Sequence, residues 1–233
     1  MGRWKELIMV QEKNKPREVV VEVGFGKAWK LGELSGKNPD TVYIGMEVPS
    51  RVGKVESWKP NLVLDYKGGL VGLVELPNES VKQVVMDLVL DEDFTLTPIE
   101  LAISFPMARI NELSEGMLDG RQAEAMHTSF QFWRKQMLKQ VKRVLKPDGT
   151  LEVNTSKGNL GMMEQLLKEV GFSYESKPAT AEEIGKSQYM SGIAEKIRKG
   201  EDGFTAEMDG MMHITARKKP EIRERRLLPP PEK

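Results

Sequence analysis

Short apolar runs of strand length alternate with helical patterns along most of the chain, and this alternation limits the possible folds more than any other feature. The runs lie at 19–23, 42–47, 62–65, 84–90, 150–153 and 211–216. Strands that alternate with helices are typical of βαβ units, in which the strands are parallel and the helices cover the sheet. We therefore predict an α/β fold with a mostly parallel sheet.

The helical patterns are clearest at 122–145 and 161–170. In the first, apolar residues recur at helical spacing, and Pro147 and Gly149 follow it, so we expect the helix to stop before the next strand. In the second, Gly171 comes directly after the last apolar residue and predicts the end of the helix.

The later part of the chain changes in composition. A polar, acid-rich stretch at about 178–210 separates the last strand candidate from the rest, and we interpret it as an insert within one domain at 1–217. Residues 218–233 are rich in basic residues and proline, so we expect a disordered tail there.

Composition narrows the chemistry. The 35 Lys and Arg residues balance the 35 Asp and Glu residues, so the net charge does not draw the protein to nucleic acid, and a basic surface would have to be local. There are no cysteines and only two histidines, which excludes disulfides and thiolate-bound zinc, and we expect no metal site. No apolar run approaches the roughly 18–20 residues that span a bilayer. We expect a soluble, cytoplasmic protein with no membrane partner.

Two groups of residues remain open to a functional or a structural reading. His127 and His213 lie within predicted helix and strand, and we interpret both as structural. A dense basic stretch follows on the long helix, which we interpret as a solvated face, with an RNA contact as the alternative. Its residues are Lys135, Lys139, Lys142, Arg143 and Lys146.

A glycine turn follows the first strand candidate in the stretch VVVEVGFGKAW. Gly24 and Gly26 let the backbone approach a ligand closely and direct amide donors at it. A dinucleotide fingerprint would need a small residue at the position of Trp29, so we exclude that cofactor class. A turn whose third small residue is Ala28 fits the spacing instead.

An acidic residue, Glu47, ends the next strand candidate in VYIGMEV. Its carboxylate is suited to accept hydrogen bonds from both hydroxyls of a ribose, and such charge-assisted bonds are among the strong ones in proteins. Together with the turn at Gly24, Glu47 predicts a nucleoside-binding site at the carboxyl ends of two adjacent strands.

Several separated segments between residues 19 and 217 resemble the class I S-adenosylmethionine-dependent methyltransferases. VVVEVGFGKAW resembles their first motif, IGMEV their acidic ribose-binding strand end, LVLDY their third strand, and VLKPDGTLEV their turn into strand five. The resemblance implies S-adenosyl-L-methionine as the cofactor. It also implies a Rossmann-like seven-stranded sheet with helices on both faces and the last strand antiparallel, and MMHITARKK is placed to be that strand.

The same resemblance assigns the cofactor-binding residues. In that superfamily the acid that ends the third strand lies near the adenine, and the first motif and the ribose-binding acid provide the remaining contacts. Carried onto this sequence, the residues are Glu22, Gly24, Phe25, Gly26, Glu47 and Asp65.

The methyl acceptor is indicated by a closer resemblance, to the bacterial-type tRNA (guanine-N7) methyltransferases, in VEVGFGKAW, NPDTVYIGMEV and SFQFWRKQMLKQVKRVLKPDGTLEV. It implies a heteroaromatic nitrogen as the acceptor, and Ser191 stands where that family has a guanine-binding Thr. We expect Asp87, at the end of the fourth strand, to face the transferred methyl group, because ligands bind at the carboxyl ends of such sheets. The alternative is that Asp87 caps the following helix.

Part of the substrate region departs from that family. Ala194 stands where the family has a Glu, and MDLVLDEDFTL replaces an Asp-Pro-Trp-Pro run followed by basic residues. Residues 91–124 carry eight acidic and two basic side chains, whereas tRNA phosphates attract Lys and Arg. Two alternatives therefore stay open: a small-molecule methyltransferase, and a non-catalytic partner subunit that binds S-adenosylmethionine.

Overall fold

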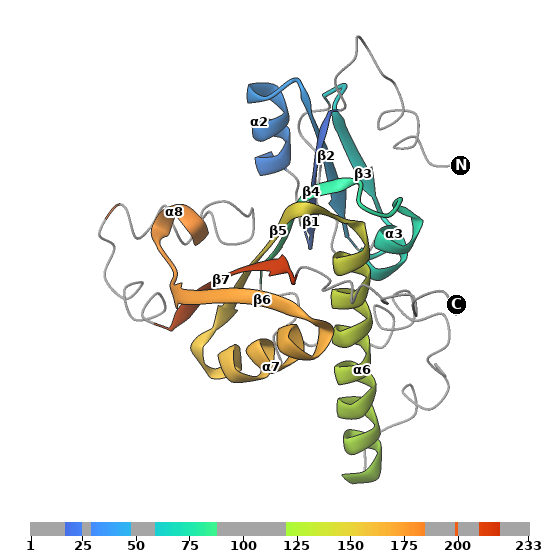
Figure 1. Ribbon diagram of the computed structural model, residues 1–233, viewed down its shortest axis with the longest axis vertical. Coiled ribbons are helices and arrows are strands. Elements are labelled where there is room, and N and C mark those ends of the chain that lie inside the picture. Colours follow the sequence, from blue (N-terminus) through green and yellow to red (C-terminus); the bar gives the residue numbers. More distant parts are fainter. Residues whose placement is uncertain are drawn as a thin grey trace, which may run out of the picture.

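The computed structural model describes residues 17–24, 29–47, 59–87, 120–184, 199 and 210–219. These residues form one seven-stranded sheet in the order β3-β2-β1-β4-β5-β7-β6 (Figure 1). The strands are β1 (Glu18–Val23), β2 (Thr41–Met46), β3 (Leu62–Asp65), β4 (Val81–Asp87), β5 (Leu145–Ser156), β6 (Phe172–Pro178) and β7 (Met211–Lys218).

The first five strands in chain order are parallel where they pair, and β7 lies antiparallel to both of its neighbours, β5 and β6. This mixed sheet confirms the predicted α/β class and the Rossmann-like seven-stranded sheet with its last strand antiparallel. It also confirms MMHITARKK as the antiparallel strand, which runs to Lys218.

Helices cover the sheet on both faces. One face carries α3, α6 and α7, whose apolar residues join the main core, and the other carries α2, which packs on β2 and β3. The helices are α2 (Trp29–Lys37), α3 (Gly69–Glu75), α6 (Gly120–Val144), α7 (Leu160–Val170) and α8 (Ala181–Ile184), with a short 3-10 helix η2 (Lys157–Asn159).

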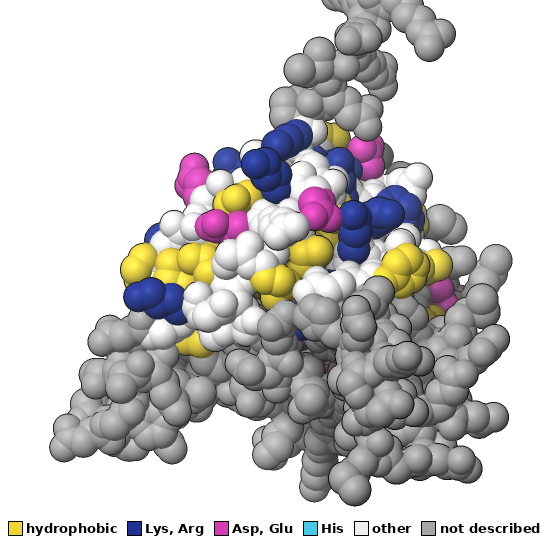
Figure 2. Space-filling view, turned by 90° about the horizontal axis from the view of Figure 1, so that it is seen from below, with side chains coloured by type: hydrophobic (Ala, Val, Ile, Leu, Met, Phe, Trp, Pro, Cys, Tyr) yellow, Lys and Arg dark blue, Asp and Glu magenta, His cyan; other side chains and the backbone are white. Residues whose placement is uncertain are grey.

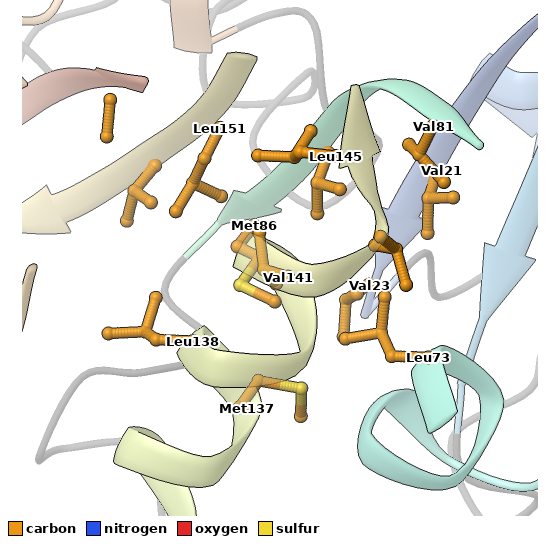
Figure 3. Packing of buried hydrophobic residues seen from close by; sticks show 14 of the residues in the cluster. Val21, Val23, Leu73, Val81, Met86, Met137, Leu138, Val141, Leu145 and Leu151 are labelled. Atoms are coloured by element: carbon orange, nitrogen blue, oxygen red, sulfur yellow. The ribbon is translucent and has the colours of Figure 1, made fainter. Parts of the chain in front are cut away.

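The main core lies between the sheet and α6 (Figure 3). Alternate residues of the central strands point to this face, among them Val21, Met86 and Leu151, and they meet Met137 and Val141 of α6. All five are fully buried or nearly so. Full burial of such a side chain contributes about 1.5–3 kcal/mol to the stability of the fold. The packing on α6 therefore holds together β1 on one side of β4 and β5 on the other.

The glycines of α3 explain why this helix was not predicted. A Cβ on Gly69 would collide with Val23 of β1, and one on Gly72 would lie 2.8 Å from Met46 Sδ of β2. The helix therefore packs so closely on the ends of β1 and β2 that a larger residue at either position would have to displace Val23 or Met46. Its formation depends on this tertiary contact, because glycine by itself disfavours a helix.

The helix and strand ends agree with the predictions within a few residues, with one clear difference at β5. Gly171 ends α7 in the left-handed conformation, with φ 86°, as predicted. However, β5 begins at Leu145 and includes Pro147 and Gly149, which we expected to lie before the strand. The pairing of β4 with β5 shifts its register between Val81 and Gln83, so the strand starts with an irregular segment that can contain a proline.

The edge strand β6 is not among the strands that we predicted from the sequence. Only Phe172 is fully buried at its start, and most of its remaining side chains are exposed. Phe172 and Tyr174 alternate with polar residues, which is the pattern of a half-buried strand, but the run is short and ends in charged residues and Pro178.

The basic stretch on α6 is partly used for contacts within the fold. Arg143 donates hydrogen bonds to the carbonyl oxygens of Leu73 at 2.7 Å and Leu76 at 2.8 Å, and so caps the end of α3. Lys142 Nζ donates to the carbonyl oxygen of Val170 at 3.0 Å. On the face shown in Figure 2, basic and acidic side chains are mixed over the described surface.

Candidate cofactor and acceptor site

The ends of four adjacent parallel strands meet at one edge of the sheet. In the register, Val23 of β1 pairs with Met46 of β2 and with Met86 of β4, and Met46 pairs with Asp65 of β3. Residues that directly follow these pairs therefore lie at the same level. Among them is Asp87, which ends β4. This is the carboxyl edge, where open α/β sheets bind their ligands.

Two glycines shape the backbone at this edge. Gly24 has φ 80° and donates its N–H to the carbonyl oxygen of Met46 at 2.8 Å. Gly68 has φ 84° and donates to the carbonyl oxygen of Glu47 at 3.1 Å. Both are in the left-handed region that favours glycine, which explains the glycine directly after β1. Phe25 and Gly26, the next residues of the predicted turn, lie outside the described residues.

Glu22 and Glu47 share one face of the sheet. Strand alternation places both on the side of Tyr43, which is the face that α2 covers. Glu22 pairs in the sheet with Gly45, which carries no side chain. Glu22 is 3% exposed and Glu47 is 8% exposed. Two buried carboxylates on one face form a set of hydrogen-bond acceptors suited to hydroxyl and ammonium donors.

Asp65 lies at the same edge, but alternation directs it to the other face, where α3 packs. Its Oδ1 accepts the backbone N–H of Lys67 at 3.1 Å, and Lys67 Nζ in turn donates to Glu75 Oε1 of α3 at 2.7 Å. Burial raises the pKa of Asp65, and the hydrogen bond from Lys67 opposes that rise. Asp65 therefore holds the turn into α3 in addition to any contact with a ligand.

The structure describes only part of the region that we predicted to face the methyl acceptor. The register pairs Asp87 with Asn154 of β5, and the side chain of Asp87 lies outside the description. Ser191 lies outside the described residues altogether. Asn154 is buried, and its Oδ1 lies 2.8 Å from Nδ1 of His213 on β7. His213 is 3% exposed, in agreement with its structural interpretation.

A cluster of polar residues joins this edge to the chain that leaves β6. Glu183 Oε1 accepts a hydrogen bond from Lys177 Nζ at 2.7 Å and lies 3.9 Å from His213 Nε2. Glu183 Oε2 accepts the backbone N–H of Thr180 at 2.9 Å, while the Thr180 hydroxyl accepts the N–H of Glu183 at 3.2 Å. We call Asn154, Lys177, Thr180, Glu183 and His213 the docking cluster.

The electrostatics of the docking cluster centre on Glu183. Burial opposes ionisation of its carboxyl, but hydrogen bonds from Lys177 and Thr180 and the nearness of His213 outweigh it and hold the pKa of Glu183 at about 2. The sequence interpretation missed this residue. The signal for it was the capping box Thr-x-x-Glu in TAEE, which begins the short helix α8.

Among the described residues, no group of three or more His, Cys, Asp or Glu side chains is placed to hold a metal ion. None of the helices in the described ranges combines the length and the apolar character needed to cross a membrane.

No protein-family model and no curated protein sequence matches the chain. Solved structures do match it. The 16S rRNA methyltransferase KamB is 13% identical over 93% of this chain and 93% of that chain, with a TM-score of 0.49. A TehB-like SAM-dependent methyltransferase from Corynebacterium glutamicum is 14% identical over 88% of this chain and 83% of that chain, with a TM-score of 0.47.

A third match has a different activity in its name. The [4+2]-cyclase SpnF is 15% identical over 93% of this chain and 80% of that chain, with a TM-score of 0.49. At such identities and TM-scores, these likenesses do not decide what the site binds. The residues of the chain itself provide the grounds for a function.

Proposed function

We propose that this protein is an S-adenosylmethionine-dependent methyltransferase that binds its cofactor at the carboxyl ends of β1, β2 and β3. The observation that carries the proposal is the pair of Gly24 and Glu47. Gly24, with its positive φ, directly follows β1, and the buried carboxylate of Glu47 directly follows the neighbouring strand β2 at the same level. The strand order of the sheet supports the same function.

The residues at this edge fit the chemical groups of that cofactor. Glu47 is suited to accept the two ribose hydroxyls, and Glu22 the ammonium group of the methionine part. Gly24, followed in the sequence by Phe25 and Gly26, gives the backbone room to approach the ligand. Asp65 is proposed near the adenine, where its carboxylate can accept the exocyclic amine.

When bound, S-adenosylmethionine supplies a methyl group on a positively charged sulfur, which a lone pair displaces. The chain has to align the acceptor and exclude water. We propose a heteroaromatic nitrogen as the acceptor, because its in-plane lone pair needs no general base. Among the described side chains, the His213 ring contacts Asn154 through Nδ1 and Thr215 through Nε2. Asp87 and Ser191 are proposed on the acceptor side.

A small-molecule acceptor is the second candidate. The acidic composition of residues 91–124 favours it over tRNA, because eight acids against two bases would repel a phosphate backbone. A cofactor-binding subunit without catalysis would show binding and no transfer.

The first test is thermal melting with S-adenosylhomocysteine. A ligand that binds only the native state, at about 100 times its dissociation constant, adds roughly 2.7 kcal/mol. For a chain of this size we expect a melting temperature about 5–10 °C higher. Glu47→Ala should abolish most of that rise by weakening binding at least about a hundredfold, since two charge-assisted hydrogen bonds of about 1.5–3 kcal/mol each are lost.

The matched control is Glu18→Ala, which removes an exposed carboxylate at the opposite end of β1. It should keep the full rise in melting temperature. No rise in the unaltered protein, or an equal rise in Glu47→Ala, would contradict the proposed cofactor site.

The acceptor is tested with radiolabelled S-adenosylmethionine and a cell extract separated into RNA, protein and metabolite fractions. Label in RNA supports a nucleobase nitrogen, and label in metabolites supports the small-molecule candidate. Cofactor binding without label in any fraction favours the non-catalytic subunit. Asp87→Asn should reduce transfer while S-adenosylhomocysteine still binds.

A further inference from the structure

The chain that leaves β6 turns back onto the carboxyl end of β5. Ala179 N–H donates to the carbonyl oxygen of Met211 at 3.0 Å, which extends the pairing of β6 with β7 by one residue. The capping box of Thr180 and Glu183 then fixes the first turn of α8. The start of the predicted insert is therefore held by specific contacts.

Glu183 connects this segment to side chains of β6 and β7. Its side chain is only 13% exposed and lies between two cationic or titratable groups, Lys177 at 2.7 Å and His213 at 3.9 Å. Hydrogen bonds to a charged group contribute more to the stability of the fold than hydrogen bonds between neutral groups. Removing the carboxylate leaves Thr180 and Lys177 without their acceptor.

Asn154 links α8, the helix that contains Glu183, to the sheet. Its Nδ2 donates to the carbonyl oxygen of Glu183 at 3.3 Å, so its Oδ1 is the atom that faces His213 Nδ1 at 2.8 Å. An amide oxygen only accepts, and the proton must therefore be on Nδ1 of the ring. Nε2 then faces the hydroxyl of Thr215 at 3.3 Å.

The position of Asn154 places the docking cluster near the proposed acceptor side of the site. Asn154 pairs with Asp87 in the sheet, so the cluster lies one strand away from the residue proposed to face the methyl group. The proposed cofactor residues lie on the other side of β4, on β1, β2 and β3. Figure 1 shows α8 beside β6 and β7, away from α3.

We propose that His213 and Glu183 are positioning residues for the methyl acceptor: they hold residues 179–184 against the end of β5, beside Asp87. This inference rests on the proposed methyltransferase function. Both residues act through others, His213 through Asn154 and Glu183 through Thr180 and the backbone of α8. Disturbing them should impair transfer to the acceptor and leave the cofactor half unchanged.

The main experiment compares Glu183→Gln with its matched control Glu182→Gln, which alters an exposed carboxylate on the same helix. Three quantities are measured on the full chain: the dissociation constant of S-adenosylhomocysteine, methyl transfer from radiolabelled S-adenosylmethionine into extract fractions, and amide hydrogen exchange of residues 179–184. In Glu183→Gln we expect transfer to fall at least tenfold and exchange to rise at least tenfold. The dissociation constant should change by less than about twofold.

A second pair of variants tests the ring. His213→Leu removes the donor to Asn154, and we expect the same loss of transfer as in Glu183→Gln. His213→Asn keeps a donor near the position of Nδ1 and should recover part of the transfer. Nitrogen NMR of the unaltered protein should show the Nδ1–H tautomer for His213, assigned by comparison with His127→Gln, because the chain has only two histidines.

Several results would overturn the inference. The first is an equal rate of hydrogen exchange for residues 179–184 in Glu183→Gln and Glu182→Gln. The second is methyl transfer at the level of the unaltered protein in both Glu183→Gln and His213→Leu. The third is a proton on Nε2 and not on Nδ1 of His213. Loss of S-adenosylhomocysteine binding together with transfer would also overturn it, because the cluster would then act on the cofactor half. Failure of the unaltered protein to bind S-adenosylhomocysteine overturns the proposed function instead, and the exchange data still measure the docking.

Discussion

The two halves of the sheet build their parts of the candidate site in different ways. At the ends of β1 to β3, backbone conformation does most of the shaping, through the left-handed glycines Gly24 and Gly68. At the ends of β5 and β7, side chains from distant positions do it, through the hydrogen bonds of the docking cluster. A site shaped by backbone needs only a few neighbouring residues, whereas a side-chain network depends on the completed fold.

If α6 unites the two halves, a truncation beneath the centre of the sheet should weaken both. Met137 is fully buried on α6, so Met137→Ala removes packing and leaves a cavity. We expect the free energy of unfolding to fall by about 2–5 kcal/mol. Urea unfolding should remain a single transition, with hydrogen exchange raised in both halves. Two separate transitions would show that the halves fold independently.

A change confined to the cofactor half should leave the docking cluster intact. Arg143→Met removes the donors to the carbonyl oxygens of Leu73 and Leu76 at the end of α3. The Leu73 oxygen still accepts the Leu76 N–H, but the Leu76 oxygen loses the Arg143 donor, and leaving one such buried acceptor unsatisfied costs about 1–3 kcal/mol. We expect faster hydrogen exchange in α3 and unchanged exchange in residues 179–184. Lys139→Met, at an exposed position of the same helix, is the control and should have little effect.

The acceptor half should respond to acid through Glu183. Its pKa of about 2 lies below the ordinary value of 4.5, so the ionised carboxylate stabilises the fold above pH 4.5, and this contribution is lost as the pH falls from 4.5 towards 2. Its size is on the order of 1–3 kcal/mol. Urea unfolding measured at several pH values should show a steeper acid loss in the unaltered protein than in Glu183→Gln. Parallel curves would show that Glu183 is not held in this way.

The smallest effect is expected at the glycine turn. Gly24→Ala forces a side chain into the left-handed region at φ 80°, which costs about 1 kcal/mol. Thermal melting should detect this small loss, and the rise in melting temperature with S-adenosylhomocysteine should also be reduced. The control is Gly158→Ala, where an added Cβ meets nothing within 4 Å. An unchanged response in Gly24→Ala would show that the turn does not approach the ligand.

The contrast between the halves also explains what the sequence revealed. The strands at 19–23, 42–47 and 62–65 were predicted because each is a compact apolar run followed by glycine or an acid. Their order along the chain and the rule that ligands bind at carboxyl ends were enough to place Gly24 and Glu47 at one edge, whereas Glu22 was assigned through the resemblance to methyltransferases. The resemblance to methyltransferases added the reversed strand, which periodicity alone does not show.

The elements that were missed depend on contacts between distant residues. The helix α3 forms because its glycines fit against Val23 and Met46, and no local pattern reports that fit. The edge strand β6 buries little of its surface, so its alternation is weak. His213 and Asn154 are 59 residues apart in the chain, and nothing near either residue marks the hydrogen bond between them.

The place of β7 in the sheet bears on how the protein is synthesised. β7 comes last of the seven strands in the chain but lies between β5 and β6. During synthesis on the ribosome, β6 therefore has no strand to pair with until residues 211–218 emerge. Until then its backbone cannot form the hydrogen bonds of the sheet. The half of the molecule that we assign to the acceptor is thus the last to assemble, and a nascent chain halted before β7 would expose two unpaired strand edges to its neighbours.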